Sequence, residues 1–181
     1  MTENIENLRT IVLRPQDCSE KMKEKFVQLV AAGGEAEEHR VRYSLPYSEV
    51  LIFTGFGNTI IGVGALLRPK TSYIQHLFEC AGEPQMSNPY SIESCWLSVS
   101  EAYRGKGVWR HNNSAKLDYI GDRPYHTIRR VANKSVADLS KEQEYVHVGK
   151  DFFSPISKHK LRLMAANHDP VFDPSKKLRY S

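Results

Sequence analysis

One stretch of the chain, residues 96–108, combines glycines and cations in a spacing that suits anion binding. It reads Trp-Leu-Ser-Val-Ser-Glu-Ala-Tyr-Arg-Gly-Lys-Gly-Val, so an expected strand ends in a turn that opens an expected helix. The first N–H groups of a helix have no partner inside it, and with the helix dipole they attract anions. Glycines let the backbone approach phosphate oxygens, and Arg104 and Lys106 add positive charge. The pattern predicts a site for a pyrophosphate or a similar group.

Two well-known phosphate loops do not fit this turn. The GxxxxGK[ST] spacing of a Walker A loop is missing. The GxGxxG pattern of dinucleotide-binding folds stops after Gly105-Lys106-Gly107, because Arg110 stands where the third glycine is needed. The alternative to an anion site is a surface turn whose cations are simply solvated.

The same turn resembles the acyl-CoA motif of the GNAT N-acetyltransferase superfamily, whose pattern is Q/R-x-x-G-x-G/A. Arg104 fills the first position and Gly107 a glycine position, whereas Trp109 stands where Gly or Ala is usual. Residues 60–66, 131–136 and 148–152 are similar to other family segments, in the family's order. The resemblance covers residues 8–163.

The resemblance implies a fold and a way of binding acetyl-CoA. The fold is α/β (α+β), a mixed and mostly antiparallel central sheet flanked by helices, with a splay between the strands at 91–100 and 126–131. The pantetheine arm would pair with the backbone of Leu97, Ser98 and Val99 in that gap. Asn133 would lie near the pantetheine, or act as a helix N-cap, or both. The pyrophosphate would be held by the amides of Arg104, Gly105, Lys106, Gly107, Val108 and Trp109.

The resemblance also implies a general base and a general acid. Glu93 stands where many members place the base, and its apolar strand predicts a raised pKa. The alternative is a glutamate at a strand edge that faces water. Ser140 occupies the position of the usual tyrosine acid, and a serine is a poor acid. Tyr145 or Tyr125 is the substitute, unless solvent protonates the thiolate.

Periodicity predicts the elements that would position these residues. Helices are expected at 17–32, 35–45, 108–120 and 133–143, and a helix or structured loop at 71–81. The helix at 108–120 is unusually polar, which predicts either partial exposure or a divergent protein. Strands are expected at 8–14, 49–55, 59–67, 91–100, 126–131, 145–149 and 159–166.

Composition sets further limits on the fold and the setting. The 181 residues are 40% hydrophobic, and a net charge of +4 suits an anionic ligand. We expect one GNAT-like domain at 1–166 and an irregular basic tail at 167–181. The longest apolar run, 60–67, is too short to span a bilayer, and the polar N-terminus does not resemble a secretory signal. Three cysteines without a CxxC motif predict a reducing, cytoplasmic setting without a structural metal. His168-Asp169-Pro170 is interpreted as a turn.

The expected activity is transfer of an acyl group, most simply acetyl from acetyl-CoA, to a primary amine of a small molecule or macromolecule. The amine would attack the thioester directly, without an acyl-enzyme, and no membrane partner is expected. One alternative is a binding or regulatory protein that keeps the fold but has lost catalysis. A further alternative is an acyltransferase that acts on a nucleic acid or an aminoacyl-tRNA. A homodimer is compatible with the sequence, which does not identify the acceptor.

Overall fold

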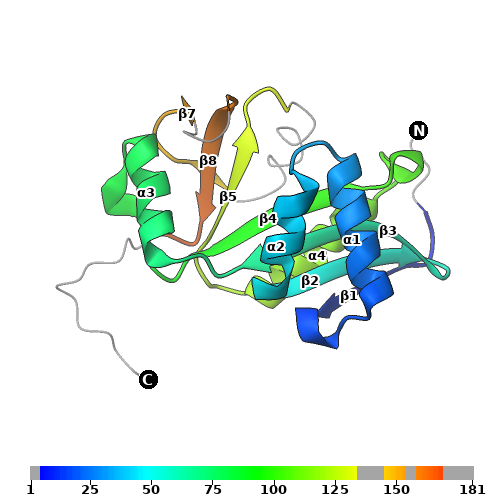
Figure 1. The fold of residues 1–181 in the computed structure, drawn as a ribbon. Coiled ribbons are helices and arrows are strands. Elements are labelled where there is room, and N and C mark those ends of the chain that lie inside the picture. Colours follow the sequence, from blue (N-terminus) through cyan, green and yellow to red (C-terminus); the bar gives the residue numbers. More distant parts are fainter. Residues whose placement is uncertain (1–4, 134–144, 154–157, 169–181) are drawn as a thin grey trace, which may run out of the picture. The chain divides into compact units, whose positions relative to one another are not determined.

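The computed structural model describes residues 5–133, 145–153 and 158–168. Contacts divide the chain into two compact units, Met1–Arg68 with Ser94–Gly121 and Pro69–Glu93 with Asp122–Ser181. The described strands follow the order β1-β2-β3-β4-β5-β8-β6, and β7 also pairs with β8 (Figure 1). Strand β4 (Ile92–Val99) crosses the boundary, so it contributes residues to both units.

The first unit is built on an antiparallel ladder. β2 pairs on one side with β1 and on the other with β3. The hairpin between β2 and β3 closes at the pair Phe56↔Thr59, and Gly57 takes the left-handed conformation there with φ 57°. The bounds are β1 Leu8–Leu13, β2 Ser48–Phe56 and β3 Thr59–Leu67.

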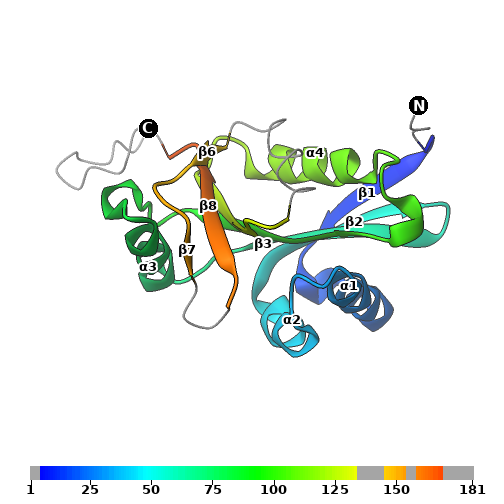
Figure 2. The same cartoon turned by 90° about the horizontal axis from the view of Figure 1, so that it is seen from above.

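Helices cover both faces of this ladder. α1 (Glu20–Ala32) and α2 (Glu38–Ser44) lie on one face, and α4 (Val108–Ile120) lies on the other (Figure 2). Helix α1 begins after Ser19, whose side chain accepts a hydrogen bond from the Met22 N–H at 3.3 Å. Short 3-10 helices occupy Pro15–Asp17, Leu45–Tyr47 and Glu101–Tyr103.

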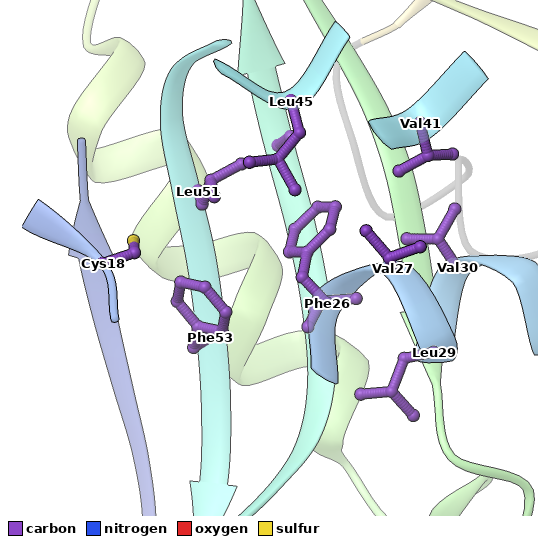
Figure 3. Packing of buried hydrophobic residues seen from close by; sticks show 11 residues of the cluster. Cys18, Phe26, Val27, Leu29, Val30, Val41, Leu45, Leu51 and Phe53 are labelled. Carbon is purple, nitrogen blue, oxygen red and sulfur yellow. The ribbon is translucent and has the colours of Figure 1, made fainter. Parts of the chain in front are cut away.

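An apolar core joins α1 and α2 to the ladder (Figure 3). Phe26 of α1 is fully buried, and its ring meets Phe53 of β2 edge-to-face at 5.9 Å between centroids. Trp96 of β4 meets the same ring at 6.1 Å. Such aromatic contacts add about 1 kcal/mol each beyond the area they bury, so this cluster anchors α1.

Helix α4 comes unusually close to β3 because two glycines face it. A Cβ at Gly62 would lie 2.6 Å from Cγ1 of Val108, and a Cβ at Gly64 would lie 2.6 Å from Oδ1 of Asn112. Glycines two apart in a strand share a face, and residues four apart in a helix do too. The first turns of α4 therefore pack against backbone instead of side chains.

The second unit is built around β8 (Lys160–Ala166). β5 (Tyr125–Arg130), β6 (Val146–His147) and β7 (Phe152–Phe153) each pair with it in antiparallel fashion. α3 (Thr71–Ala81) packs beside β8 (Figure 2). A short 3-10 helix, Pro84–Met86, follows α3. A second apolar cluster lies between α3 and β8, and it includes Ile74, Phe78, Val148, Leu163 and Ala165.

β4 and β5 pair in parallel, and only briefly. Their register contains Ile92↔Tyr125 and Glu93↔His126, although β5 continues to Arg130 beside β8. Beyond His126, β5 continues in register with β8, from Thr127↔Met164 to Arg130↔Leu161. This arrangement confirms the predicted mixed and mostly antiparallel sheet.

Most of the expected elements are present. The predicted strands and helices through residue 131 are found with ends that differ by a few residues, and 71–81 is a helix. The first helix begins later than predicted, because a 3-10 turn and the Ser19 cap come before it. The strand expected at 145–149 is reduced to β6, and β7 was not expected. The helix expected at 133–143 lies outside the described residues except for Asn133.

We predict that Gly64→Ala destabilises the protein by about 1–3 kcal/mol, because its Cβ would clash with the Asn112 amide. Urea denaturation measures this cost. In an Asn112→Ala background the clashing amide is absent, so the same substitution should cost less. Equal costs in the two backgrounds would contradict the close contact.

Candidate functional site

The turn after β4 has the geometry of an anion-binding loop. The strand ends where the Ser100 N–H donates to the Ile61 carbonyl at 2.8 Å. After the 3-10 turn, Gly105 and Gly107 both adopt left-handed φ values, 73° and 83°. Gly107 is the N-cap residue of α4 and has no side chain to cover the first amides of the helix. The sequence prediction of a glycine turn opening a helix is confirmed.

The backbone amides of this turn point to an anion site. Within the part of the chain that the structure describes, no acceptor reaches the N–H groups from Gly105 to Trp109. The neighbouring cations Arg104 and Lys106 are both exposed. Arg104 uses Nε to donate to the Val99 carbonyl at 3.2 Å, and Lys106 Nζ lies 5.8 Å from the Tyr103 ring centroid. Free amides, a helix N-terminus and two cations together favour an anion.

At the end of β4, one side chain is exposed and the next already makes a hydrogen bond within the protein. Trp96 has φ 54°, which is unusual for a residue with a bulky side chain and interrupts the regular strand. Leu97 is exposed, and the Ser98 hydroxyl donates to the Leu29 carbonyl at 2.6 Å. Because its hydroxyl is used this way, Ser98 has only backbone groups to offer a ligand.

Helix α4 places polar side chains inside the first unit. Asn112 is 1% exposed, and its Nδ2 donates to Thr54 Oγ1 at 3.2 Å, which in turn contacts Thr10 Oγ1 at 3.0 Å. Asn113 and Lys116 are buried too, whereas Arg110 and His111 are exposed. Partial exposure thus describes only one side of this helix, because its other side is both polar and buried.

Lys116 is the most unusual member of this buried set. Burial lowers the pKa of its ammonium group to about 8, while the Cys95 thiol opposes this shift. Sequence reasoning treated Lys116 only as part of a polar cluster. Its position four residues after Asn112, on the same side of α4, was the available signal.

Glu93 lies in an interior strand instead of at a sheet edge. Part of its side chain reaches the surface, but burial of the carboxyl raises its pKa to about 7. This direction agrees with the shift expected from the apolar strand. A carboxyl that titrates near neutrality can both accept and release a proton at physiological pH.

The remaining predicted residues fall in the second unit or outside the description. The Tyr125 and Tyr145 rings meet edge-to-face, with centroids 5.2 Å apart. Tyr125 follows the strand alternation, so its side chain points away from the face that holds His126 and Glu93. Asn133 follows β5, and its N–H donates to the Arg130 carbonyl at 3.0 Å. Ser140 and the tail at 169–181 lie outside the described residues.

Two buried histidines of the second unit were missed by sequence reasoning. His126 stands opposite Glu93 in the β4–β5 ladder, and His168 is hydrogen-bonded to Ser91, although the sequence around it was interpreted as a turn. These contacts join residues that are far apart in the sequence, so no local pattern indicates them.

Two further features concern membranes and metals within the described residues. No helix there has both the length and the apolar character to cross a membrane. In the same residues, no three or more His, Cys, Asp or Glu side chains gather as they would around a metal ion.

Comparison with solved structures identifies the fold. An acyl-CoA N-acyltransferase from Pseudomonas aeruginosa is 14% identical, with a TM-score of 0.59, over 88% of this chain and 99% of that one. The chain has the GNAT acetyltransferase fold. A GNAT family acetyltransferase from Elizabethkingia anophelis with acetyl-CoA bound is 8% identical, with a TM-score of 0.60, over 89% and 98% of the two chains.

Similarity to a third GNAT-fold protein is of the same order. The ribosomal-protein-S18-alanine N-acetyltransferase from Escherichia coli is 7% identical, with a TM-score of 0.59, over 87% of this chain and 92% of that one. No protein-family profile and no curated protein matches the sequence. The GNAT fold is therefore present here in a divergent sequence.

The lowered pKa of Lys116 predicts how stability changes with pH. An unfolded chain keeps this lysine protonated up to its ordinary pKa of 10.5, whereas the folded protein releases the proton near 8. Stability should therefore rise with pH from about 8 to 10.5, by up to about 3 kcal/mol. Lys116→Met should abolish this rise and be the more stable protein below pH 8.

Urea denaturation at several pH values measures this effect. Lys21→Met is the matched control, because Lys21 is an exposed lysine of α1. The prediction fails if the Lys116→Met and Lys21→Met proteins show the same pH dependence.

Proposed function

We propose that the chain is an acyl-CoA-dependent N-acyltransferase that transfers acetyl from acetyl-CoA to a primary amine. The observation that carries the proposal is the run of amides from Gly105 to Trp109 at the start of α4, for which the described residues supply no acceptor. In this fold the run follows directly after β4, and Arg104 and Lys106 flank it with positive charge. The GNAT-fold protein from E. anophelis, described with acetyl-CoA bound, supports the same ligand.

The donor would be held mainly by backbone groups. The amides from Gly105 to Trp109 would bind the pyrophosphate, with Arg104 and Lys106 adding charge. The backbone at Leu97 and Val99 would pair with the pantetheine arm as an added strand does. Asn133 would contact the same arm after β5. Trp109 departs from the family pattern, but its backbone N–H remains available.

The reaction we propose is direct attack. The amine nitrogen forms a bond to the thioester carbonyl carbon, the carbon–sulfur bond breaks, and CoA leaves as a thiolate. Glu93, directly or through a water, takes the proton that the amine loses. A backbone N–H near Val99 would stabilise the negative charge that develops on the carbonyl oxygen.

Tyr145 is our candidate for protonating the departing thiolate. It packs against Tyr125, which points to the face of the second unit opposite that of Glu93. A base and an acid on opposite faces can flank a thioester that lies in line with the strands. Solvent is the alternative proton source.

A binding protein without catalysis is the second candidate. The observation that favours it is Trp109, a bulky and half-buried residue at the position where the family motif has Gly or Ala. Such a protein would bind no acyl-CoA, or bind it without transferring the acyl group. The nucleic-acid alternative rests on the basic tail, which lies outside the described residues.

Calorimetry tests the donor site. We expect wild-type protein to bind acetyl-CoA with micromolar affinity, and Arg104→Glu with Gly107→Glu to weaken binding at least about 100-fold, because two anionic side chains replace an anion site. Arg9→Glu, a charge reversal on exposed β1, should bind normally. A folded wild-type protein that binds no acetyl-CoA would favour the binding-protein alternative.

Release of the CoA thiol tests the base. With a panel of polyamines, amino acids and lysine peptides as acceptors, Glu93→Gln should lower kcat about 100-fold, since an amide cannot take the proton. Its affinity for acetyl-CoA should be unchanged. In the wild type, kcat/KM should rise with pH through about 7, where the Glu93 carboxyl loses its proton. An unchanged kcat in Glu93→Gln would remove Glu93 from this role.

A further inference from the structure

A buried hydrogen-bonded chain in the second unit ends beside Glu93. Ser91 Oγ lies 2.8 Å from His126 Nδ1 and 2.8 Å from His168 Nε2. His168 Nδ1 lies 3.0 Å from the carbonyl oxygen of Met86. Ser91, His126 and His168 are each at most 5% exposed, so water competes little for these bonds.

The direction of every hydrogen bond in this network follows from one group that can only accept. The Met86 carbonyl can only accept, so His168 carries its proton on Nδ1 and presents a lone pair at Nε2. Ser91 has a single hydroxyl proton and donates it to that lone pair. Its oxygen then accepts from His126, which must carry its proton on Nδ1.

This assignment leaves His126 Nε2 as a bare acceptor. No donor among the described residues reaches that nitrogen, although it is buried. The ring is neutral, because burial and the neighbouring His168 lower the pKa of His126 to about 3. Buried acceptors are rarely left without a donor, so a group that can supply a hydrogen should lie close to Nε2.

Our candidate for supplying that hydrogen is Glu93. It is the register partner of His126 in a parallel pair, and side chains of such partners lie next to each other on one face. A carboxyl is a donor only when it is protonated. With its pKa raised to about 7, Glu93 is protonated for part of the time at neutral pH.

The elements beside this pair carry few titratable groups that an observed contact connects to it. His168 is the titratable neighbour of His126, and burial lowers its pKa. Helix α3 turns the Phe78 ring to both imidazoles, and Ala165 of β8 stands opposite His126. Other ionisable groups of the second unit contact one another, namely His76 with Cys80, and Asp151 with His147 and Arg162.

We propose that the chain from Met86 through His168 and Ser91 fixes His126 as the hydrogen-bond acceptor for the protonated carboxyl of Glu93. His126 is then a positioning residue, since it acts on substrate only through Glu93. The inference rests on the role of Glu93 proposed above. When Glu93 takes the proton of the amine, the new O–H group already has a partner, so the protonated base is stabilised.

Nuclear magnetic resonance of the full chain tests this without substrate. In wild-type protein, the ring nitrogen signals of His126 should show the proton on Nδ1 and none on Nε2. The Glu93 carboxyl, assigned by comparison with Glu93→Gln, should titrate near pH 7. A proton on Nε2 of His126 in the wild type would overturn the proposal, and this measurement needs no variant that has to fold.

Ser91→Ala supplies the decisive comparison. Without the hydroxyl, the His126 proton is free to move to Nε2, from where it donates to the Glu93 carboxylate and favours the charged form. The Glu93 titration should then move to lower pH by about half to one pH unit, as expected for the loss of one neutral hydrogen bond. Ser48→Ala is the matched control, because Ser48 is equally buried and its hydroxyl has no partner among the described residues.

A Glu93 titration that is identical in Ser91→Ala and wild type would contradict the proposal. Once a reactive amine is identified, the acid limb of the pH profile of kcat/KM should move in Ser91→Ala by the same amount. The KM for acetyl-CoA should stay constant. If the Glu93 titration moves but the acid limb of the kcat/KM profile does not, the catalytic role of the hydrogen-bonded network is contradicted. Because the spectroscopic readouts need no acetyl-CoA, failure of the proposed function by calorimetry remains distinguishable from failure of this inference.

Discussion

The close approach of α4 to β3 is the constraint on which the proposed donor site depends. Gly62 and Gly64 leave room for Val108 and Asn112, so the first turns of the helix lie directly on the strand. The loop from β4 to α4 is short, and two left-handed glycines carry it into the helix. These features fix the free amides from Gly105 to Trp109 at the end of β4. The same packing buries Asn112 and Lys116, whose polarity is unfavourable unless hydrogen bonds or a lowered pKa compensate.

In the proposed reaction, the second unit would supply the base through similar physics. Glu93 and His126 are next to each other where β4 and β5 pair, and both are in surroundings that disfavour charge. In the proposed network, the Met86 carbonyl, His168 and Ser91 determine which ring nitrogen of His126 donates a hydrogen bond and which accepts one. A base held in this way needs no charged neighbour to titrate near neutrality, because burial alone is sufficient.

Sequence predicted the parts that depend on local patterns. The turn at Arg104 to Gly107, the hairpin at Gly57 and the alternating strands carry their signals within a few residues. The burial of Lys116 could not be predicted, because a polar helix normally faces water and α4 packs on β1, β2 and β3, which are distant in sequence. The hydrogen bonds of His168 could not be predicted either, since its partners Ser91 and Met86 are distant in sequence. The acid position at Ser140 stays a prediction, because it lies outside the described residues.

Hydrogen exchange resolved at single amides tests the central claim most directly. The account predicts that saturating acetyl-CoA slows exchange of the amides from Gly105 to Trp109 by at least about tenfold, because phosphate oxygens become their acceptors. Amides in the middle of α1 should be unaffected. Unchanged exchange from Gly105 to Trp109 at saturating acetyl-CoA would contradict the assignment of this turn as the donor site.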